Sequence, residues 1–365
     1  MTNVLSIMTY TIRLLSILLI LALKLSADPI LSSWFTKYSG QYARIYETAA
    51  DESALNSVTT WSHPNNGSGQ ALPTYAGVHE IAYTETNVYI RTSGLGFHVM
   101  GPWYLNEERT NLFPNYPSNT SAMFRFPRVR GAPPISKTAT GNGTIGYFVD
   151  GIGMFDSRDA FSYSNSNAGD ARPNSNFTGD GIWNRDAYVN ESVTFDSAHA
   201  HQADINHHYH ANPPALRHLI GDSVDYDAST NTYTENFNGQ HSPIMAWVRD
   251  GYPIYGPYGY DDPDDTYSTV RRMITGYTIR DGSNGTTNLN DTGRTSLPSW
   301  AAVVQGINAA LTTDQFGPDV GEAYPLGHYI EDYNYLGHLG FTLGSDFDLD
   351  EHNGRFAVTP EYPFG

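Results

Sequence analysis

Histidines are concentrated in one short stretch of the chain. The segment HAHQADINHHYHANPP carries five of the protein's 13 histidines. In an extended strand, side chains two residues apart point to the same face, so His199 can pair with His201, and His208 with His210. If the two segments pair as strands, three or four ring nitrogens converge on one cation. The pattern predicts a metal site with His201, His208 and His210 as its main ligands and His199 as an additional candidate.

A histidine cluster without a functional metal is the alternative hypothesis. A β-rich protein could bury Tyr209 and leave His208 and His210 in contact with solvent, with no ligand. His207 and His218 have no same-face partner in the strand interpretation, and we assign neither a ligand role.

The ligand set predicted from composition contains nitrogen and oxygen but no sulfur. The chain has no cysteine, so thiolates can neither ligate a metal nor form disulfides. Histidine with carboxylate suits copper or zinc, and suits iron(II) less well. A calcium site is a further possibility, since residues 346, 348 and 350 are acidic. It would not be an EF-hand, because Glu351 and Ala357 stand where the turn glycine and the bidentate glutamate belong.

The composition predicts a mainly β fold. Aromatic residues make up 13% of the chain, which supplies apolar surface for a core, and 34 glycines with 21 prolines favour many short strands and turns. We expect a large β-sandwich or barrel-like assembly of short antiparallel strands with few short helices. Hairpins are predicted over residues 78–94, 145–155 and 244–256, the last two around Asp-Gly turns.

Helical signals and domain boundaries are sparse. The capping pattern predicts helices over residues 212–221 and 299–313. The repeated Asp-Gly device suggests two β-rich parts, residues 28–180 and 181–365, the second carrying the histidine cluster. One continuous domain is the alternative.

The N-terminal residues predict export. Arg13, an apolar run over residues 14–23 and the small residues Ser26 and Ala27 have the layout of a secretory signal peptide, residues 1–27. The run is short of the ~20 residues that cross a bilayer, although Lys24 leaves an uncleaved anchor as an alternative. We expect a secreted or extracellular protein, periplasmic or at the cell surface if bacterial, without a stable membrane span after signal removal. The formal charge of -18 argues against a nucleic-acid partner.

Several long blocks of the sequence resemble one family. NHHYHANPPALRHLIGDSV (206–224), HSPIMAWVRDGYPIYGPYGY (241–260) and LDEHNGRFAVTPEYP (349–363) are similar to the YHYH domain family, as are SGQYARIYE, HVMGPWY, NYPSN and GDGIWNRDAYVNE upstream. The family is named for a Tyr-His-Tyr-His string. This chain departs from it at His207, which stands in place of the first tyrosine, while both histidines and the second tyrosine are kept.

The resemblance implies a secreted or cell-surface protein but no established reaction. Because it includes the block around Asp350 and His352, these two residues are additional candidate ligands that would have to fold back onto the cluster. It also implies a further aromatic strand after the last block, beyond Gly365.

Two function hypotheses follow. In the first, the protein binds copper or zinc, with or without a hydrolytic or oxidative activity, and releases the metal as pH falls below about 6, near the pKa of free histidine. In the second, it is a non-catalytic surface or matrix module, in which aromatic residues such as Trp103, Trp183 or Tyr258 stack on a glycan. No thiol nucleophile, serine elbow, phosphate loop or His-Glu-x-x-His motif is present, so whether the protein is an enzyme stays open, as does a small-molecule ligand.

Overall fold

The expected mainly β architecture is confirmed. A computed structural model describes residues 28–129, 131, 140–141, 143–172 and 179–365, and the predicted signal peptide lies outside this part. Strands account for 29% of the residues and helices for 16%, and no closed barrel is found among the described residues. No helix in the described ranges is long and apolar enough to cross a membrane.

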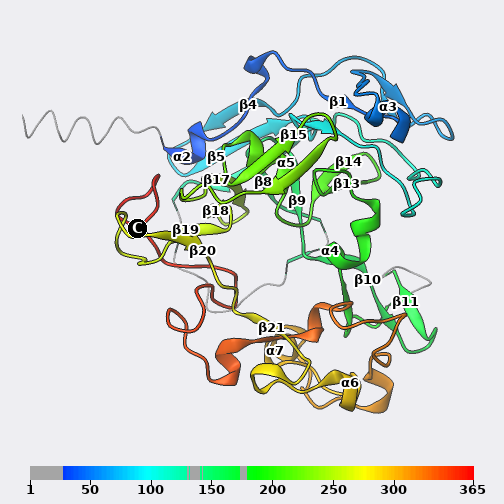
Figure 1. Cartoon of the computed structure of the whole chain (residues 1–365), viewed down its shortest axis with the longest axis vertical. Coiled ribbons are helices and arrows are strands. Elements are labelled where there is room, and N and C mark those ends of the chain that lie inside the picture. Colours follow the sequence, from blue (N-terminus) through cyan, green and yellow to red (C-terminus); the bar gives the residue numbers. More distant parts are fainter. Residues whose placement is uncertain (1–27, 130, 132–139, 142, 173–178) are drawn as a thin grey trace, which may run out of the picture.

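A six-stranded sheet forms the centre of the larger half of the molecule (Figure 1). Its strands, in spatial order, are β13 (Ala200–Ala203), β14 (Asn206–Tyr209), β9 (Gly153–Phe155), β8 (Thr144–Phe148), β17 (Ile244–Val248) and β18 (Pro253–Tyr255). The β14/β9 pair is parallel and the other neighbours are antiparallel. The sheet therefore joins chain segments from both sides of residue 180.

A second sheet shares its core with the first. It consists of β4 (Val78–Tyr83), β5 (Asn87–Thr92) and β7 (Ala122–Pro127), all antiparallel. The largest hydrophobic cluster combines Val88, Ile90 and Phe126 from this sheet with Phe148 and Trp247 from the central one. Burial of such side chains stabilises the fold by roughly 1.5–3 kcal/mol each, so the two sheets stabilise one another.

The other half of the molecule has its own smaller core around Trp183, Leu297 and Tyr329. It contains the sheet β11 (Gly169–Ala171), β10 (Arg158–Ser164) and β12 (Asn184–Asp186), and the pair β21 (Tyr277–Ile279) and β22 (Tyr333–Tyr335). In Figure 1, α6 and α7 lie in this half, and α4 lies between it and the central sheet.

The remaining elements are short. The other strand pairs are β1 (Arg44–Ile45) with β6 (Val99–Met100), β2 (Trp61–Ser62) with β3 (Gly69–Gln70), β15 (Val224–Asp227) with β16 (Thr232–Glu235), and β19 (Tyr258–Tyr260) with β20 (Val270–Arg272). The α-helices are α2 (Pro29–Ser32), α3 (Ala49–Ser53), α4 (Ala187–Glu191), α5 (Pro214–Leu219), α6 (Leu289–Thr292) and α7 (Ser299–Gln305). Helix α7 is shorter than predicted, because Gly306 ends it in the left-handed conformation with φ +67°.

All three predicted hairpins form, but the Asp-Gly turns differ from the two-residue type expected. In each, the glycine amide closes a turn three residues back, Gly151 to the Phe148 carbonyl and Gly251 to the Val248 carbonyl. Only the glycines have positive φ, +86° and +82°. Each loop therefore has three residues, a tight turn followed by a left-handed glycine.

We predict that Gly151→Ala destabilises the protein more than Gly221→Ala does. Both glycines have positive φ, +86° and +77°, which costs an alanine about 1–2 kcal/mol. An added Cβ at Gly151 would also lie 2.9 and 3.0 Å from backbone atoms of Gly77, whereas at Gly221 it would have no neighbour within 4 Å. Denaturant unfolding of both variants measures the difference, and equal losses would contradict the proposed close approach.

Candidate metal centre

The β13/β14 hairpin brings the predicted histidines together. The strands are antiparallel, with His201 directly opposite His208. Opposed residues share a face of a sheet, and His210 follows two positions after His208 on that same face. The convergence expected from the His-x-His spacing is therefore present in the structure.

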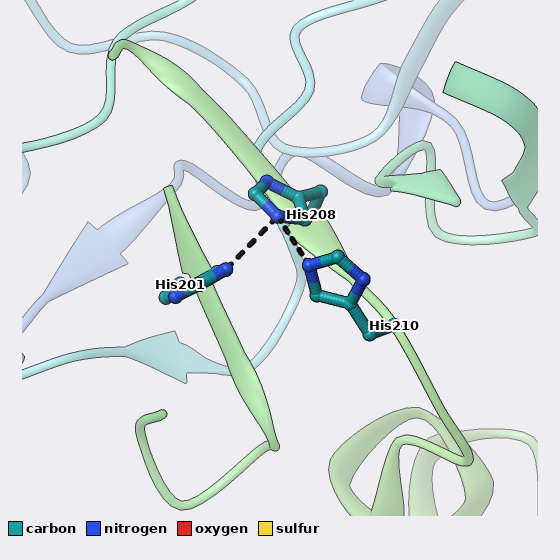
Figure 2. Close-up of side chains that lie close together, drawn as sticks. All are labelled: His201, His208 and His210. Atoms are coloured by element: carbon teal, nitrogen blue, oxygen red, sulfur yellow. Dashed lines mark hydrogen bonds between the residues drawn. The ribbon is translucent and has the colours of Figure 1, made fainter. Parts of the chain in front are cut away.

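The three rings point their Nε2 atoms at one another, as Figure 2 shows. The Nε2 atom of His208 lies 3.0 Å from that of His201 and 3.0 Å from that of His210. His201 and His208 are 5% and 2% exposed. The centre is therefore a compact set of nitrogen atoms largely removed from water.

A fourth ligand candidate, Glu191, is supplied by helix α4. Its Oε2 atom lies 3.1 Å from Nε2 of His210 and 3.5 Å from Nε2 of His201. This oxygen is buried and faces both ring nitrogens. Burial alone would raise the pKa of Glu191, but His210, His201 and Arg185 outweigh it and hold that pKa below its ordinary value. Glu191 is therefore a carboxylate at neutral pH.

Helix α4 is fixed in place at its first residues and by Asn190. The Asp186 side chain caps the helix by accepting from the Val189 amide. The side-chain amide of Asn190 donates through Nδ2 to the backbone carbonyls of Asp186 and His328. The second of these bonds anchors the helix to the smaller half of the molecule. Glu191, the last helical residue, is thereby held over the hairpin.

The hydrogen-bond partners of the three Nδ1 atoms, which point away from the cluster, determine where the ring protons lie. Nδ1 of His208 is 3.0 Å from the Asn206 carbonyl, and Nδ1 of His210 is 2.7 Å from the Asp156 carbonyl. A carbonyl can only accept, so both Nδ1 atoms carry the proton. For His201, the partner is the Thr194 hydroxyl at 2.7 Å, whose own proton goes to the Glu191 carbonyl at 2.6 Å. Nδ1 of His201 is therefore also the donor.

A neutral imidazole carries one ring proton. Because that proton is on Nδ1 in each of these rings, the Nε2 atoms that face one another have none when the rings are neutral. Burial is the main cause that lowers the pKa of His201 to about 4 and that of His208 well below its usual value, so both are neutral at pH 7. If His210 carried a second proton, on Nε2, that proton could form only one hydrogen bond. Nε2 of His201 and Nε2 of His208 would still face each other as two lone pairs. Such an arrangement is stabilised by a cation bound between the nitrogens.

Phenylalanine rings enclose the cluster. Phe155 stacks on His208 with ring centroids 3.8 Å apart, and Phe195 meets His201 edge-on at 5.0 Å. These rings limit water access and the rotation of the imidazoles. The Glu191 side chain is 23% exposed, so the centre reaches solvent at the carboxylate.

The additional candidates do not join this group. His199 has positive φ and contacts the Tyr188 hydroxyl through Nδ1 at 3.4 Å. Asp350 accepts from the amides of His352 and Gly354 within its own turn, and the His352 ring lies 3.3 Å from Glu351. The groups of closely spaced ligand atoms found in the described residues contain none of the three.

Two other sequence-based hypotheses meet structural obstacles. In the acidic stretch considered for calcium, both carboxylate oxygens of Asp348 bind the Arg271 guanidinium, at 2.6 and 2.8 Å. The aromatic residues considered for glycan stacking are all buried, Trp103 at 0%, Trp183 at 1% and Tyr258 at 8% exposure. Those three rings therefore cannot stack on a sugar at the surface.

Sequence reasoning missed Glu191, and it missed a second buried group formed by His98, Asp196 and His207. Glu191 ends the block GDGIWNRDAYVNE, one of the stretches that carry the family resemblance, so a signal for it was present. His98 lies more than a hundred residues before His207, and no local pattern connects them.

Comparison with known families supports the resemblance. The sequence model of the YHYH protein family matches residues 124–365, which is about two thirds of the chain. The chain belongs to the YHYH protein family. The matched region contains Glu191, His201, His208 and His210. Neither the curated proteins nor the solved structures contain a match to this chain.

The metal-free protein should lose stability as pH falls, in part through His201. The pKa of His201 is about 4 in the folded protein, against 6.5 as its ordinary value. Between these pH values the unfolded chain binds the extra proton, so stability is full above about pH 6.5 and falls by ~1.4 kcal/mol per pH unit down to about pH 4. His201→Gln should weaken this dependence.

The measurement is urea unfolding of chelator-treated protein at about pH 7 and pH 4.5. Comparison with His201→Gln removes the contribution of other titrating groups. The same slope in both proteins would contradict the lowered pKa. Because protons compete poorly for such a nitrogen, metal release is also expected at a lower pH than the value of about 6 predicted from free histidine.

Proposed function

We propose that this YHYH-family protein is a secreted metal-binding protein that holds one zinc or copper(II) ion with His201, His208, His210 and Glu191. One observation carries the proposal: three imidazoles, each with a proton fixed on Nδ1, turn their Nε2 atoms toward one another beside a carboxylate, and the two that face each other across the hairpin, His201 and His208, are neutral. Secretion rests on the sequence of residues 1–27 and on the family resemblance.

The spacing of the four ligand atoms supports a small, tightly bound ion. A tetrahedral site with bonds of ~2.0–2.1 Å has ligand atoms about 3.3–3.4 Å apart. Four of the six separations in this group lie between 3.0 and 3.5 Å. The set of ligand atoms that all lie within 4.8 Å of one another contains the three histidines without Glu191, so the Glu191 side chain would have to move toward His208 when an ion binds. Nitrogen and oxygen donors without sulfur suit zinc and copper(II). Calcium, which prefers six to eight oxygens, does not suit a group of three imidazoles and one carboxylate.

The number of protein ligands favours a structural or metal-holding role over hydrolytic catalysis. Structural zinc sites have four protein ligands, whereas catalytic sites have three and a water molecule. With Glu191 bound, the four protein ligands complete a tetrahedral sphere. A catalytic role would require Glu191 to move away or a fifth ligand to enter from its exposed side.

We predict that tag-free protein binds zinc or copper at this centre and that His208→Ala/His210→Ala abolishes binding there. Two of four ligands are lost, and the remaining pair cannot hold the ion against dilution. The measurement is metal content by mass spectrometry after incubation with the metal and desalting. Glu191→Gln, which keeps three imidazoles, should retain the metal with weaker affinity.

The matched control is His79→Ala/His352→Ala, which also removes two histidines. His79 contacts the Tyr75 carbonyl and His352 contacts Glu351, so neither faces the centre. This control should keep the full metal content. If wild type gains no metal, or if the control loses as much as the cluster variant, the proposed function is wrong.

Thr194→Val should weaken metal binding about 10–100-fold, as losses of such supporting hydrogen bonds do. Valine has nearly the same shape but cannot accept the proton of His201 Nδ1. The measurement is the dissociation constant by competition with a chromophoric chelator. Thr234→Val, on the exposed face of β16, is the matched control, and equal affinities in the two variants would contradict the role of Thr194.

A further inference from the structure

The opposite face of the β13/β14 hairpin carries a second group of potential ligands. Side chains alternate along a strand, so His207 and Tyr209 point away from the face of His208. There His207 packs against His98 and Trp103, with ring centroids 6.1 and 5.5 Å apart. Ligand atoms of His98, Asp196 and His207 all lie within 4.8 Å of one another.

Asp196 provides a fixed, buried negative charge. Its Oδ2 accepts from the amide of Gly101 at 2.8 Å, and its Oδ1 accepts from the amides of Ala198 and Ala200 at 2.9 and 3.2 Å. The side chain is fully buried, and its one ion-pair partner among the described residues is His98, whose Nε2 lies 3.9 Å from Oδ2. That distance is too long for a hydrogen bond.

The hydrogen bonds around His98 leave Nε2 of its neutral ring without a proton. Nδ1 of His98 lies 3.4 Å from the Tyr209 hydroxyl, which donates to Asp150 at 3.2 Å. The tyrosine oxygen is thus free to accept from Nδ1. Nε2, which has no hydrogen-bond partner in the described part of the chain, then presents a lone pair toward a carboxylate.

His207 is a buried polar side chain whose ring nitrogens form no hydrogen bond of normal geometry within the described residues. It is 2% exposed, and its one polar contact of this kind is a poorly aligned one with the backbone of His201. An unsatisfied buried polar group costs about 1–3 kcal/mol. A cation bound to one nitrogen would offset part of this cost and would also pair with Asp196.

We propose that His98, Asp196 and His207 form a second metal site for a zinc- or copper-type cation, separate from the three-histidine centre. The 3.9 Å separation of His98 Nε2 and Asp196 Oδ2 is longer than the spacing of ligand atoms around a bound zinc ion, so these side chains close inward when the ion binds. His98 immediately precedes β6 and Asp196 precedes β13, so the ion links these two strands across the core. The site is enclosed, and its role is structural.

The competing arrangement is a charged His98 paired with Asp196, with water filling the remaining space. Zinc stoichiometry by equilibrium dialysis and mass spectrometry separates the two. The proposal expects two zinc ions per chain in wild type and one in His207→Tyr, which keeps an aromatic ring and restores the family string. A wild type that binds one ion, with His207→Tyr unchanged, overturns it.

The first centre is tested in the same experiment by His208→Ala/His210→Ala. This variant should keep one zinc ion, bound at the second site. Adding His207→Tyr to it should remove that ion as well. If the alanine variant loses nothing while His207→Tyr loses one ion, the proposed function fails and the second site stands.

A measurement on wild type alone covers the case in which the variants do not fold. Cadmium-113 NMR of protein loaded with two equivalents of cadmium should give two resonances, because the two donor sets differ. A single resonance overturns the second site.

Discussion

The centre of this structure depends on one electrostatic constraint: the buried Nε2 lone pairs of His201 and His208 face each other without a proton between them. The carbonyls of Asn206 and Asp156 and the hydroxyl of Thr194 take the Nδ1 protons of the three rings. Burial keeps His201 and His208 neutral by lowering their pKa values. The 3.0 Å contact between Nε2 of His201 and Nε2 of His208 is then favourable only around a cation.

The surrounding fold holds the ligands in this arrangement. The β13/β14 hairpin is attached to the central sheet through β9, and that sheet shares a core with β4, β5 and β7. Helix α4 brings Glu191 from the side of the smaller half. Rotation of one ring away from the cluster would break its outer hydrogen bond, so the arrangement of the rings is maintained by contacts on both sides of each imidazole.

Sequence patterns predicted those features that depend on residues close together in the chain. The His-x-His spacing predicted that the three histidines lie together, because strand periodicity and hairpin pairing suffice to bring them together. The glycines of the Asp-Gly pairs identified the loops, although the turns have three residues rather than two. Gly306 lies inside the helix predicted over residues 299–313, whereas in the structure it ends that helix after Gln305.

Long-range contacts could not be read in the same way. Glu191 reaches the cluster because α4 is anchored on the other half of the molecule through Asn190 and the His328 carbonyl, and His98 reaches His207 across the core. His207 stood out only as a departure from the family string. Asp350 and His352 had the appropriate chemistry for ligands, but their segment forms its own turn.

The most direct test is anomalous X-ray diffraction from crystals of the tag-free protein grown with zinc, recorded at the zinc absorption edge. A bound zinc ion would give a peak between the hairpin and α4, ~2.0–2.2 Å from Nε2 of His201, His208 and His210 and from an oxygen of Glu191. If no anomalous peak appears at the centre at saturating zinc, and the density there is that of water, the proposed metal site is wrong.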